Sequence, residues 1–372
     1  MKIINVVGAR PNFMKIAPII EEMRKNDIEQ ILVHTGQHYD SQMSKLFFDD
    51  LKLPKPDIDL EVGSGSHAQQ TAEIMKKFET VLLEYGPDYI LVVGDVNSTI
   101  ACALTASKLG IRIIHVEAGL RSFDRSMPEE INRILTDALS DYLFITEKGA
   151  HENLLREGIS DKKIFFVGNV MIDTLLKHRE RADRSEILSR MGIKDTKYIL
   201  VTLHRPSNVD NHETLERLLS SFNEISHTYP LVFPCHPRTR SRIEEFKLER
   251  YIKSSENPVS VGINLCDPVG YLDFVKLMTK ASLVLTDSGG IQEETTILGV
   301  PCITLRENTE RPVTVADGTN QIVGTDKRKI IEHSSRVLNG NYSTGRIPDL
   351  WDGRAAQRIV KVLQKNTNQE VK

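Results

Sequence analysis

Three acidic side chains stand at positions where general acids and bases are often found. Asp95 directly follows one apolar run, Glu117 ends another, and Glu129 lies just behind a proline at the start of a helical pattern. A carboxylate at the end of a strand can act as a general acid or base. The alternative roles are structural, because Asp95 can cap the next helix and Glu129 can favour its helix dipole. Three acids that a sheet gathers at one edge indicate proton transfer.

A metal site is the other chemistry that this region allows. The two-residue period of a strand places His115 and Glu117 on one face, and both residue types bind metals. A third ligand is not evident nearby in the sequence. We therefore expect neither a metal nor another cofactor.

The segment Gly8-Ala-Arg-Pro-Asn12 follows the first apolar run and leads into a helical pattern that contains Lys15. Gly8 permits a tight turn, the helix start offers unpaired N–H groups, and Arg10 and Lys15 add positive charge. The segment is therefore a candidate anion site, although a purely structural turn fits it equally well. It lacks the second and third glycines of the GxGxxG pattern, so no dinucleotide fingerprint is present.

A glycine pair in the second half of the chain is a more specific anion-site candidate. Ser288, Gly289 and Gly290 open a helix after an apolar run, where exposed N–H groups and the positive helix end can hold a diphosphate. Glu294 follows about one turn later, near enough to hydrogen-bond a ribose. Arg311 is a further candidate for contact with a phosphate or substrate.

Two histidines in the same half are each followed by basic residues. His204 precedes Arg205, and His236 precedes Pro237 and Arg238. An imidazole and a guanidinium together can bind a phosphate or transfer a proton. With 11 histidines in the chain, ordinary loop residues are the default interpretation of both.

These candidate residues need a scaffold, and the order of the apolar runs predicts an α/β fold. Runs rich in Val, Ile and Leu alternate with stretches of helical period, as in a parallel sheet covered on both faces. Such sheets bind ligands at the carboxyl ends of their strands, where the candidate residues lie. The predicted strands span residues 3–7, 31–34, 89–93, 112–116, 142–145, 164–167, 198–202, 231–234, 283–286 and 302–305.

The chain also contains one local pattern twice. An apolar run, an Asp, a helical stretch, a Leu-Gly pair and a new apolar run occur around Asp95 and again around Asp287. The repeat favours two similar doubly wound domains, although any two βαβ units share some likeness. We expect residues 1–170 to form the first domain and residues 171–352 the second. The amphipathic stretch 353–372 must pack somewhere, and in two-domain proteins of this kind it often returns to the first domain.

Composition restricts the class of protein. Apolar residues make up 40% and charged residues 27% of the 372-residue chain, which is typical of a globular protein with an ample core. The net charge of -3 gives no basic field for nucleic acid. No apolar run approaches the ~20 residues that cross a bilayer, and the first segment lacks a signal-peptide pattern, so we expect a cytoplasmic protein. The four cysteines lack metal-site spacing and are expected in the core.

Taken in order, these segments resemble the non-hydrolysing UDP-N-acetylglucosamine 2-epimerases. Each segment alone is weak evidence, but the set spans nearly the whole chain and is highly specific. The matching segments are Gly8-Ala-Arg-Pro with Lys15, Gly36-Gln-His38, Gly94-Asp95, His115-Val-Glu-Ala-Gly-Leu-Arg121, Pro128-Glu-Glu-Ile-Asn-Arg133, His204-Arg205, Thr286-Asp-Ser-Gly-Gly-Ile-Gln-Glu-Glu294, Thr309-Glu-Arg-Pro312 and Gly324-Thr-Asp326.

The resemblance implies two Rossmann-like domains that face a cleft, an architecture of the GT-B type. It implies interconversion of UDP-GlcNAc and UDP-ManNAc, in which UDP is eliminated, a 2-acetamidoglucal stays trapped, and UDP adds back. No nicotinamide or metal is required, and a homodimer is expected. The residues that it assigns to catalysis are Asp95, Glu117, Glu129 and His204. Those that it assigns to substrate binding are Arg10, Lys15, Phe274, Ser288, Gly289, Gly290, Glu294 and Arg311.

One departure from the family pattern concerns regulation. Bacterial members carry a second UDP-GlcNAc site that activates the enzyme, and Gln37, Glu130 and His236 fit that site. Pro206 stands where a second Arg follows the His-Arg pair, and His67 stands near where another Arg is expected. Activation by substrate therefore stays open. The competing interpretations of the whole chain are a hydrolysing relative, a GT-B glycosyltransferase and a noncatalytic UDP-sugar sensor.

Overall fold

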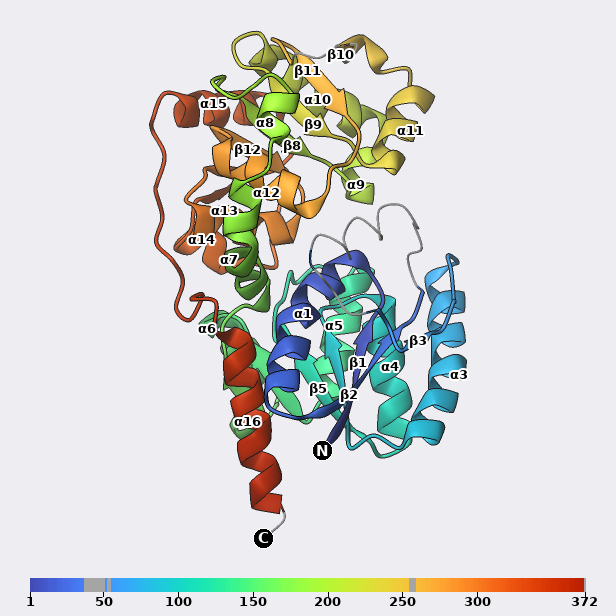
Figure 1. Ribbon diagram of the computed structural model, residues 1–372. Coiled ribbons are helices and arrows are strands. Elements are labelled where there is room, and N and C mark those ends of the chain that lie inside the picture. The colour runs from blue at the N-terminus through green and yellow to red at the C-terminus, as the bar shows by residue number, and fades with distance from the viewer. Residues whose placement is uncertain (37–50, 52–54, 254–258, 371–372) are drawn as a thin grey trace. The chain divides into compact units, whose positions relative to one another are not determined.

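The computed structural model describes residues 1–36, 51, 55–253 and 259–370, with the backbone alone described at residues 10 and 366–370. The chain divides into two compact units, Met1–Lys177 with Asp349–Lys372 and His178–Pro348. Each unit is built on one seven-stranded sheet with helices around it (Figure 1). Neighbouring strands are parallel throughout both sheets. The predicted α/β class with two Rossmann-like, doubly wound domains is confirmed.

The sheet of the first unit has the strand order β3-β2-β1-β4-β5-β6-β7. The strand order reverses direction between β1 and β4, which is where doubly wound sheets bind ligands. Alternation along β1 sends Ile3 and Val7 into the core on one face of the sheet and Ile4 and Val6 into the core on the other. The strands are β1 (Lys2–Val7), β2 (Glu29–His34), β3 (Ile58–Asp59), β4 (Tyr89–Val93), β5 (Arg112–Val116), β6 (Tyr142–Ile145) and β7 (Ile164–Phe166).

Helices cover both faces of this sheet. The helices α1 and α16 pack together over the face that carries Ile3, and α3 and α4 pack over the face that carries Ile4. The helix α5 packs beside α4. The helices are α1 (Arg10–Lys25), α3 (His67–Tyr85), α4 (Asn97–Lys108), α5 (Pro128–Leu139), α6 (Lys148–Arg156), the 3-10 helix Asp161–Lys163, α7 (Val170–Asp183), which continues into the second unit, and α16 (Ala355–Glu370).

The sheet of the second unit has the order β10-β11-β9-β8-β12-β13-β14, and its direction reverses between β8 and β12. The strands are β8 (Ile199–Thr202), β9 (Leu231–Pro234), β10 (Ile252–Lys253), β11 (Ile263–Cys266), β12 (Leu283–Thr286), β13 (Cys302–Thr304) and β14 (Asn320–Ile322). The helices are α8 (Ile187–Arg190), α9 (Pro206–Val209), α10 (His212–Ser226), α11 (Pro237–Glu245), the 3-10 helix Glu249–Tyr251, α12 (Tyr271–Lys280), α13 (Gly289–Leu298), α14 (Pro312–Ala316) and α15 (Lys327–Leu338).

The repeated sequence pattern corresponds to β4-α4-β5 in the first unit and β12-α13-β13 in the second. In both, the Leu-Gly pair ends the helix, because Gly110 and Gly299 adopt left-handed φ angles of 70° and 69°. All the predicted strands are present. The strands β3, β10, β11 and β14 were missed, because they are short and carry polar residues, as in Asn320-Gln-Ile322.

The C-terminal helix α16 lies in the first unit beside α1. Asp173 on α7 caps it, because the N–H groups of Ala355 and Ala356 donate to the two Asp173 carboxylate oxygens at 3.1 and 2.8 Å. Burial raises the pKa of Asp173 to about 6. Just before the helix, the buried indole of Trp351 donates from Nε1 to the carbonyl oxygen of Thr146 at 2.9 Å.

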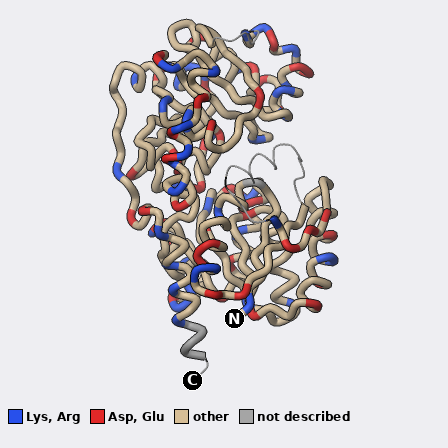
Figure 2. The backbone as a smooth tube through the Cα atoms, viewed as in Figure 1, with Lys and Arg blue, Asp and Glu red and all other residues tan. Residues whose placement is uncertain are grey.

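Charged side chains of both signs are interspersed along both units (Figure 2), in line with the small net charge of -3. None of the helices in the described ranges is both long and apolar enough to span a membrane.

Candidate active site

The carboxyl ends of β1, β4 and β5 meet at one edge of the first unit, because these strands are neighbours in its sheet. Gly8, Asp95 and Glu117 follow the three strands. The N–H group of Gly94 donates to the carbonyl oxygen of Val116 at 3.1 Å, which ties the end of β4 to the end of β5. The sheet therefore brings two of the predicted acids to one place.

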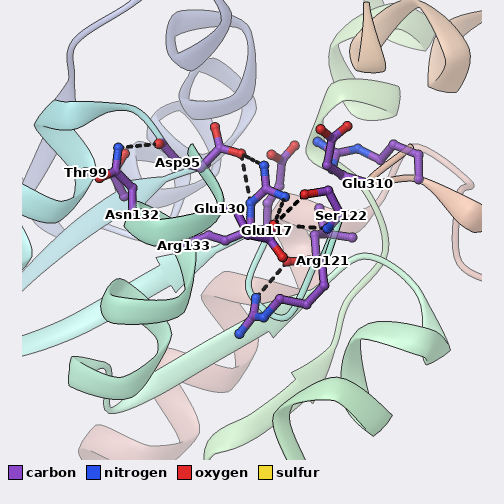
Figure 3. A network of polar contacts seen from close by, with 12 residues as sticks. Asp95, Thr99, Glu117, Arg121, Ser122, Glu130, Asn132, Arg133 and Glu310 are labelled. Carbon is purple, nitrogen blue, oxygen red and sulfur yellow. Dashed lines mark hydrogen bonds and ion pairs between the residues drawn. The ribbon is translucent and has the colours of Figure 1, made fainter. Parts of the chain in front are cut away.

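Asp95 is held by Arg133 from α5 (Figure 3). The Arg133 guanidinium approaches Asp95 Oδ2 through Nη2 at 2.5 Å and Nε at 3.2 Å. The side chain of Asp95 keeps 28% of its surface exposed, whereas that of Arg133 keeps 4%. The helix α4 begins with Val96 as its N-cap, whose side chain makes no capping bond.

Glu117 lies one residue beyond β5 and has a left-handed backbone with φ of 70°. The strand alternation that was expected to align it with His115 therefore does not extend to this residue. A non-glycine residue in this conformation costs about 1–3 kcal/mol, which the surrounding contacts must offset. The N–H groups of Glu117 and Ala118 both donate to the carbonyl oxygen of Phe144, at 3.0 and 3.1 Å. Lys15 Nζ lies 2.5 Å from Glu117 Oε2.

The predicted anion segment after β1 is already engaged within the first unit. Asn12 Oδ1 accepts the N–H groups of Gly8 and Ala9 at 3.3 and 2.9 Å. A Cβ on Gly8 would lie 2.0 Å from Ser98 Oγ and 2.5 Å from Ser98 Cβ, so the close approach of Ser98 requires glycine. Lys15 is paired with Glu117. The neighbouring Arg10 begins α1, and its side chain lies outside the described part of the chain.

The two acids at the start of α5 have different surroundings. Glu129 is half-buried in the first turn of the helix. Glu130 is buried and accepts hydrogen bonds from Ser122 N and Oγ at 3.0 Å, from Phe123 N at 2.9 Å and from Arg133 Nη1 at 2.7 Å. Glu130 therefore fixes the loop before α5 and the cation that holds Asp95. Its predicted part in a second nucleotide site stays a prediction.

Sequence reasoning gave no individual role to several buried partners of these acids. Arg133 and Asp137 lie four and eight residues after Glu129, on one side of α5, and that i, i+4 spacing was the available signal. Asp137 accepts from Arg121 Nη2 at 2.7 Å and lies 2.6 Å from His115 Nδ1. Arg121 and Arg133 are the last residues of two of the segments that carry the family resemblance.

In the second unit, a buried carboxylate organises the predicted diphosphate loop. Asp287 follows β12, and its oxygens accept the N–H groups of His204 and Arg205, with shortest distances of 3.1 and 2.9 Å. The His204 ring also contacts it, with Nδ1 2.9 Å from Oδ1. Burial acts to raise the pKa of Asp287, but His204 and the backbone donors outweigh it and lower that pKa. Ser288 then serves as the N-cap of α13, which starts at Gly289.

Glu294 lies inside the second unit, where Tyr271 OH donates to its Oε1 at 3.0 Å. Burial raises the pKa of Glu294 to about 8, although the bond from Tyr271 acts in the opposite direction. Phe274 follows on the same helix as Tyr271 and is half-buried. The helices that carry these residues, α12 and α13, are in contact. The predicted roles of Glu294 and Phe274 at a nucleoside stay predictions.

Arg311 is buried beside the same loop and its Nε lies 2.5 Å from Glu293 Oε1. The preceding Glu310 is held by both terminal nitrogens of Arg306, at 3.0 and 2.7 Å. Burial acts to raise the pKa of Glu310, but Arg306 outweighs it and holds that pKa well below its usual range. A Cβ on Gly289 would lie 3.7 Å from Glu310 Oε2. Ion pairs therefore fix the groups around the start of α13.

The remaining predicted residues concern the second nucleotide site. Gln37 lies outside the described residues. His236 is exposed and caps α11, since its Nδ1 accepts the N–H of Arg238 at 3.2 Å. His67 Nδ1 lies 3.1 Å from Asn97 Nδ2. In the ranges that the structure covers, no group of three or more His, Cys, Asp or Glu residues has the arrangement of a metal site.

Comparison with known proteins places this arrangement in a family. The family model described as UDP-N-acetylglucosamine 2-epimerase matches residues 21–364. A UDP-N-acetylglucosamine 2-epimerase homolog of Methanococcus maripaludis is 48% identical over 370 residues, covering 98% of this chain and 99% of the relative. A UDP-2,3-diacetamido-2,3-dideoxy-D-glucuronate 2-epimerase of Pseudomonas aeruginosa is 42% identical over 370 residues, covering 98% of this chain and 100% of the relative.

A solved structure gives the same result. The crystal structure of Methanocaldococcus jannaschii UDP-GlcNAc 2-epimerase, in complex with UDP-GlcNAc and UDP, matches with a TM-score of 0.90 and 45% sequence identity. The match covers 98% of this chain and 100% of that chain. The predicted resemblance is confirmed, and the chain belongs to the UDP-N-acetylglucosamine 2-epimerase family.

Proposed function

We propose that this protein interconverts UDP-GlcNAc and UDP-ManNAc by inverting carbon 2 of the sugar, without releasing free sugar. The observation that carries the proposal is the pair of carboxylates Asp95 and Glu117, each beside a cation at the ends of neighbouring strands. The family match over most of the chain supports it, as does the relative that was solved with UDP-GlcNAc and UDP.

The chemistry explains why such a site needs several charged groups. The proton on carbon 2 is not acidic, because no adjacent ketone stabilises the anion that its removal would leave. The bond between carbon 1 and the diphosphate oxygen must therefore break as the proton leaves, and UDP takes the electron pair. A 2-acetamidoglucal with a C1=C2 double bond remains. Re-addition of UDP restores the C1–O bond while an acid delivers a proton to the opposite face of carbon 2.

The acids of the first unit are the proposed proton carriers. A base serves one face of the sugar and an acid serves the other, so at least two groups that transfer protons are required. Both Asp95 and Glu117 lie beside a cation, Arg133 and Lys15 respectively, each at 2.5 Å. Glu129, in the first turn of α5, is the third candidate.

The second unit is the proposed holder of UDP. The N–H groups at the start of α13, from Ser288 to Gly290, suit the diphosphate. His204, held by Asp287, and Arg311, held by Glu293, add charge and hydrogen-bond donors that stabilise the leaving group as its charge grows.

Incubation of the purified protein with UDP-GlcNAc in D2O, followed by proton and phosphorus NMR, tests the proposal. Elimination and re-addition predict UDP-ManNAc with deuterium at carbon 2, because the carboxyl groups exchange their protons with solvent. Free ManNAc with stoichiometric UDP would instead identify a hydrolysing enzyme. Unchanged UDP-GlcNAc that nevertheless binds would identify a noncatalytic sensor.

A second candidate substrate follows from one relative. The P. aeruginosa protein that is 42% identical carries the name of an epimerase for UDP-2,3-diacetamido-2,3-dideoxy-D-glucuronate. The same carbon is inverted in that reaction, on a sugar that bears a carboxylate and a second acetamido group. A direct comparison of kcat/KM for the two UDP-sugars decides between them, and we expect the higher value for UDP-GlcNAc.

We also propose that two copies of the chain associate. Ile131 and Leu135 lie one turn apart on α5 and are 42% and 49% exposed, which is unusual for large apolar side chains on neighbouring turns. Light scattering coupled to size exclusion should give twice the chain mass of 42.1 kDa. A Leu135→Lys variant should shift the protein toward the single-chain mass, and a wild-type protein that already elutes as a single chain would exclude the dimer.

A further inference from the structure

A buried ionic network contacts the chain segments that carry Glu117 and Asp95, and the proposed reaction assigns no role to it. Its members are His115 on β5, Asp137 on α5 and Arg121 in the loop after β5, with Glu157 at the end of α6 as the outermost member. The side chains of His115 and Asp137 have no exposed surface, and that of Arg121 keeps 1%. Such a network is costly unless every member is well paired.

Asp137 fixes the chain on both sides of Glu117. Its Oδ1 lies 2.6 Å from His115 Nδ1, and its Oδ2 accepts the N–H of Gly119 at 3.0 Å. His115 precedes Glu117 by two residues and Gly119 follows it by two. One carboxylate on α5 therefore brackets the residue whose backbone is strained.

The imidazole of His115 extends this support to Asp95. Its Nε2 lies 2.9 Å from the carbonyl oxygen of Gly94, the residue just before Asp95. The N–H of Gly94 is held from the other side by the carbonyl oxygen of Val116. Gly94, which leads into Asp95, is thus held at both its N–H and its carbonyl oxygen, and the second of these bonds comes from the ring that Asp137 contacts.

The hydrogen-bond partners define the charge of His115. A backbone carbonyl only accepts, so Nε2 must carry a proton to bond Gly94. Asp137 is assigned as a carboxylate, because its Oδ2 lies 2.7 Å from Nη2 of Arg121, a guanidinium that is always charged and pairs with carboxylates. The same oxygen accepts from Gly119. Nδ1 must then donate to Oδ1 as well. A ring with protons on both nitrogens is an imidazolium, and the two cations His115 and Arg121 are balanced by Asp137 and Glu157.

We propose that Asp137 is a positioning residue that holds His115 as a buried imidazolium and thereby fixes Glu117 and Asp95 for proton transfer at the sugar. The effect on turnover rests on the proposed epimerisation, whereas the charge of His115 does not. A residue of this kind supports the rate without touching the substrate, because small displacements of reacting groups slow a reaction by about 100-fold.

The variant Asp137→Asn removes the charge of the side chain and keeps its shape. Its amide oxygen can still accept the N–H of Gly119, and its amide nitrogen can donate to Nδ1 of a neutral His115. These neutral hydrogen bonds are roughly half as strong as the charge-assisted ones, so the chain around Glu117 and Asp95 is held less firmly. We expect kcat for UDP-GlcNAc to fall by about 100-fold while KM stays close to the wild-type value. In 15N spectra of histidine-labelled protein, both ring nitrogens of His115 should have protonated shifts in the wild type, and Nδ1 should lose its proton in the variant.

Asp141→Asn is the matched control. Asp141 also accepts a backbone N–H from the start of β5, that of Ile113 at 3.0 Å, but it contacts neither His115 nor Gly119 in the described bonds. We expect this variant to keep the wild-type kcat and the protonated His115 signals. Equal kcat values for Asp137→Asn and Asp141→Asn would overturn the positioning role.

The wild-type spectrum decides the charge assignment even if Asp137→Asn does not fold. A single protonated nitrogen on His115 overturns the proposal, and two protonated nitrogens support it. Assignment of the signal uses its disappearance in His115→Asn. If the wild type shows the imidazolium but does not epimerise UDP-GlcNAc, the proposed function fails, and the failure is distinguishable because the charge of His115 is measured without substrate.

Discussion

Lys15 Nζ and Glu117 Oε2 lie 2.5 Å apart, and their side chains keep only 11% and 2% of their surface exposed. The ammonium comes from α1 and the carboxylate from the residue after β5. The ion pair therefore joins the segment that was expected to bind an anion to the acid that was expected to transfer a proton. Each charge depends on the other, because an unpaired charge at this depth is strongly unfavourable.

Lys15→Met should destabilise the protein by about 3–5 kcal/mol, because the variant keeps the length of the side chain but removes the buried cation beside Glu117 Oε2. Urea denaturation followed by circular dichroism measures the change. The double variant Lys15→Met with Glu117→Gln should recover much of the loss. Lys76→Met is the control, since Lys76 pairs with Glu73 on the surface, and it should change nothing measurable. If the double variant loses as much unfolding free energy as the two single variants together, Lys15 and Glu117 do not stabilise each other.

Glu294 should make stability depend on pH. Its pKa of about 8 in the folded protein exceeds its ordinary value of 4.5, so the folded state holds the proton more tightly. The stability that this group contributes is therefore complete below about pH 4.5 and is lost as the pH rises through about 8. Glu294→Gln mimics the protonated form and should lose less stability between pH 6 and 9 than the wild type. If the free energy of unfolding changes equally with pH in both proteins across that range, Glu294 is ionised throughout.

Gly119→Ala should cost more stability than Gly110→Ala. Both glycines have left-handed φ angles, 77° and 70°, at which alanine costs about 1–2 kcal/mol. A Cβ on Gly119 would also lie 2.5 Å from the carbonyl oxygen of Ala150, whereas nothing lies within 4 Å of one on Gly110. Thermal unfolding of the two variants gives the comparison. Equal losses of stability in the two variants would mean that the backbone at Ala150 shifts to accommodate the new Cβ.

Arg311→Ala should weaken UDP binding by about tenfold or more, the effect of losing one charged hydrogen bond. Isothermal titration with UDP measures it. Arg346→Ala is the control, because Arg346 pairs with Asp317 in the same unit but keeps 78% of its side chain exposed. If Arg311→Ala binds UDP with unchanged affinity, Arg311 has only a structural role, in its ion pair with Glu293.

The sequence was sufficient for ten of the fourteen strands in the described parts of the two sheets, and for which strand ends carry acids. That success has a physical cause, since continuous Val, Ile and Leu runs mark buried parallel strands and such sheets gather ligand groups at one edge. Asp95 and Glu117 were predicted on this basis, and the structure places both beside cations at that edge.

The parts of the site that the sequence did not predict depend on tertiary contacts. The bond from Gly119 to Asp137 joins residues 18 positions apart, and no local pattern encodes it. The left-handed backbone of Glu117 breaks the strand period that was used to align it with His115. The interior position of Glu130 was equally hidden, because an acid in the first turn of a helix is usually solvated.

The central claim is that UDP leaves the sugar and returns, and positional isotope exchange tests it most directly. UDP-GlcNAc carrying 18O in the bond between carbon 1 and the β-phosphate is incubated with the protein and examined by phosphorus NMR. The account predicts that the label spreads into the non-bridging positions of the β-phosphate as UDP-ManNAc forms. Epimerised product that retains all of its label in the bridging position would contradict the account.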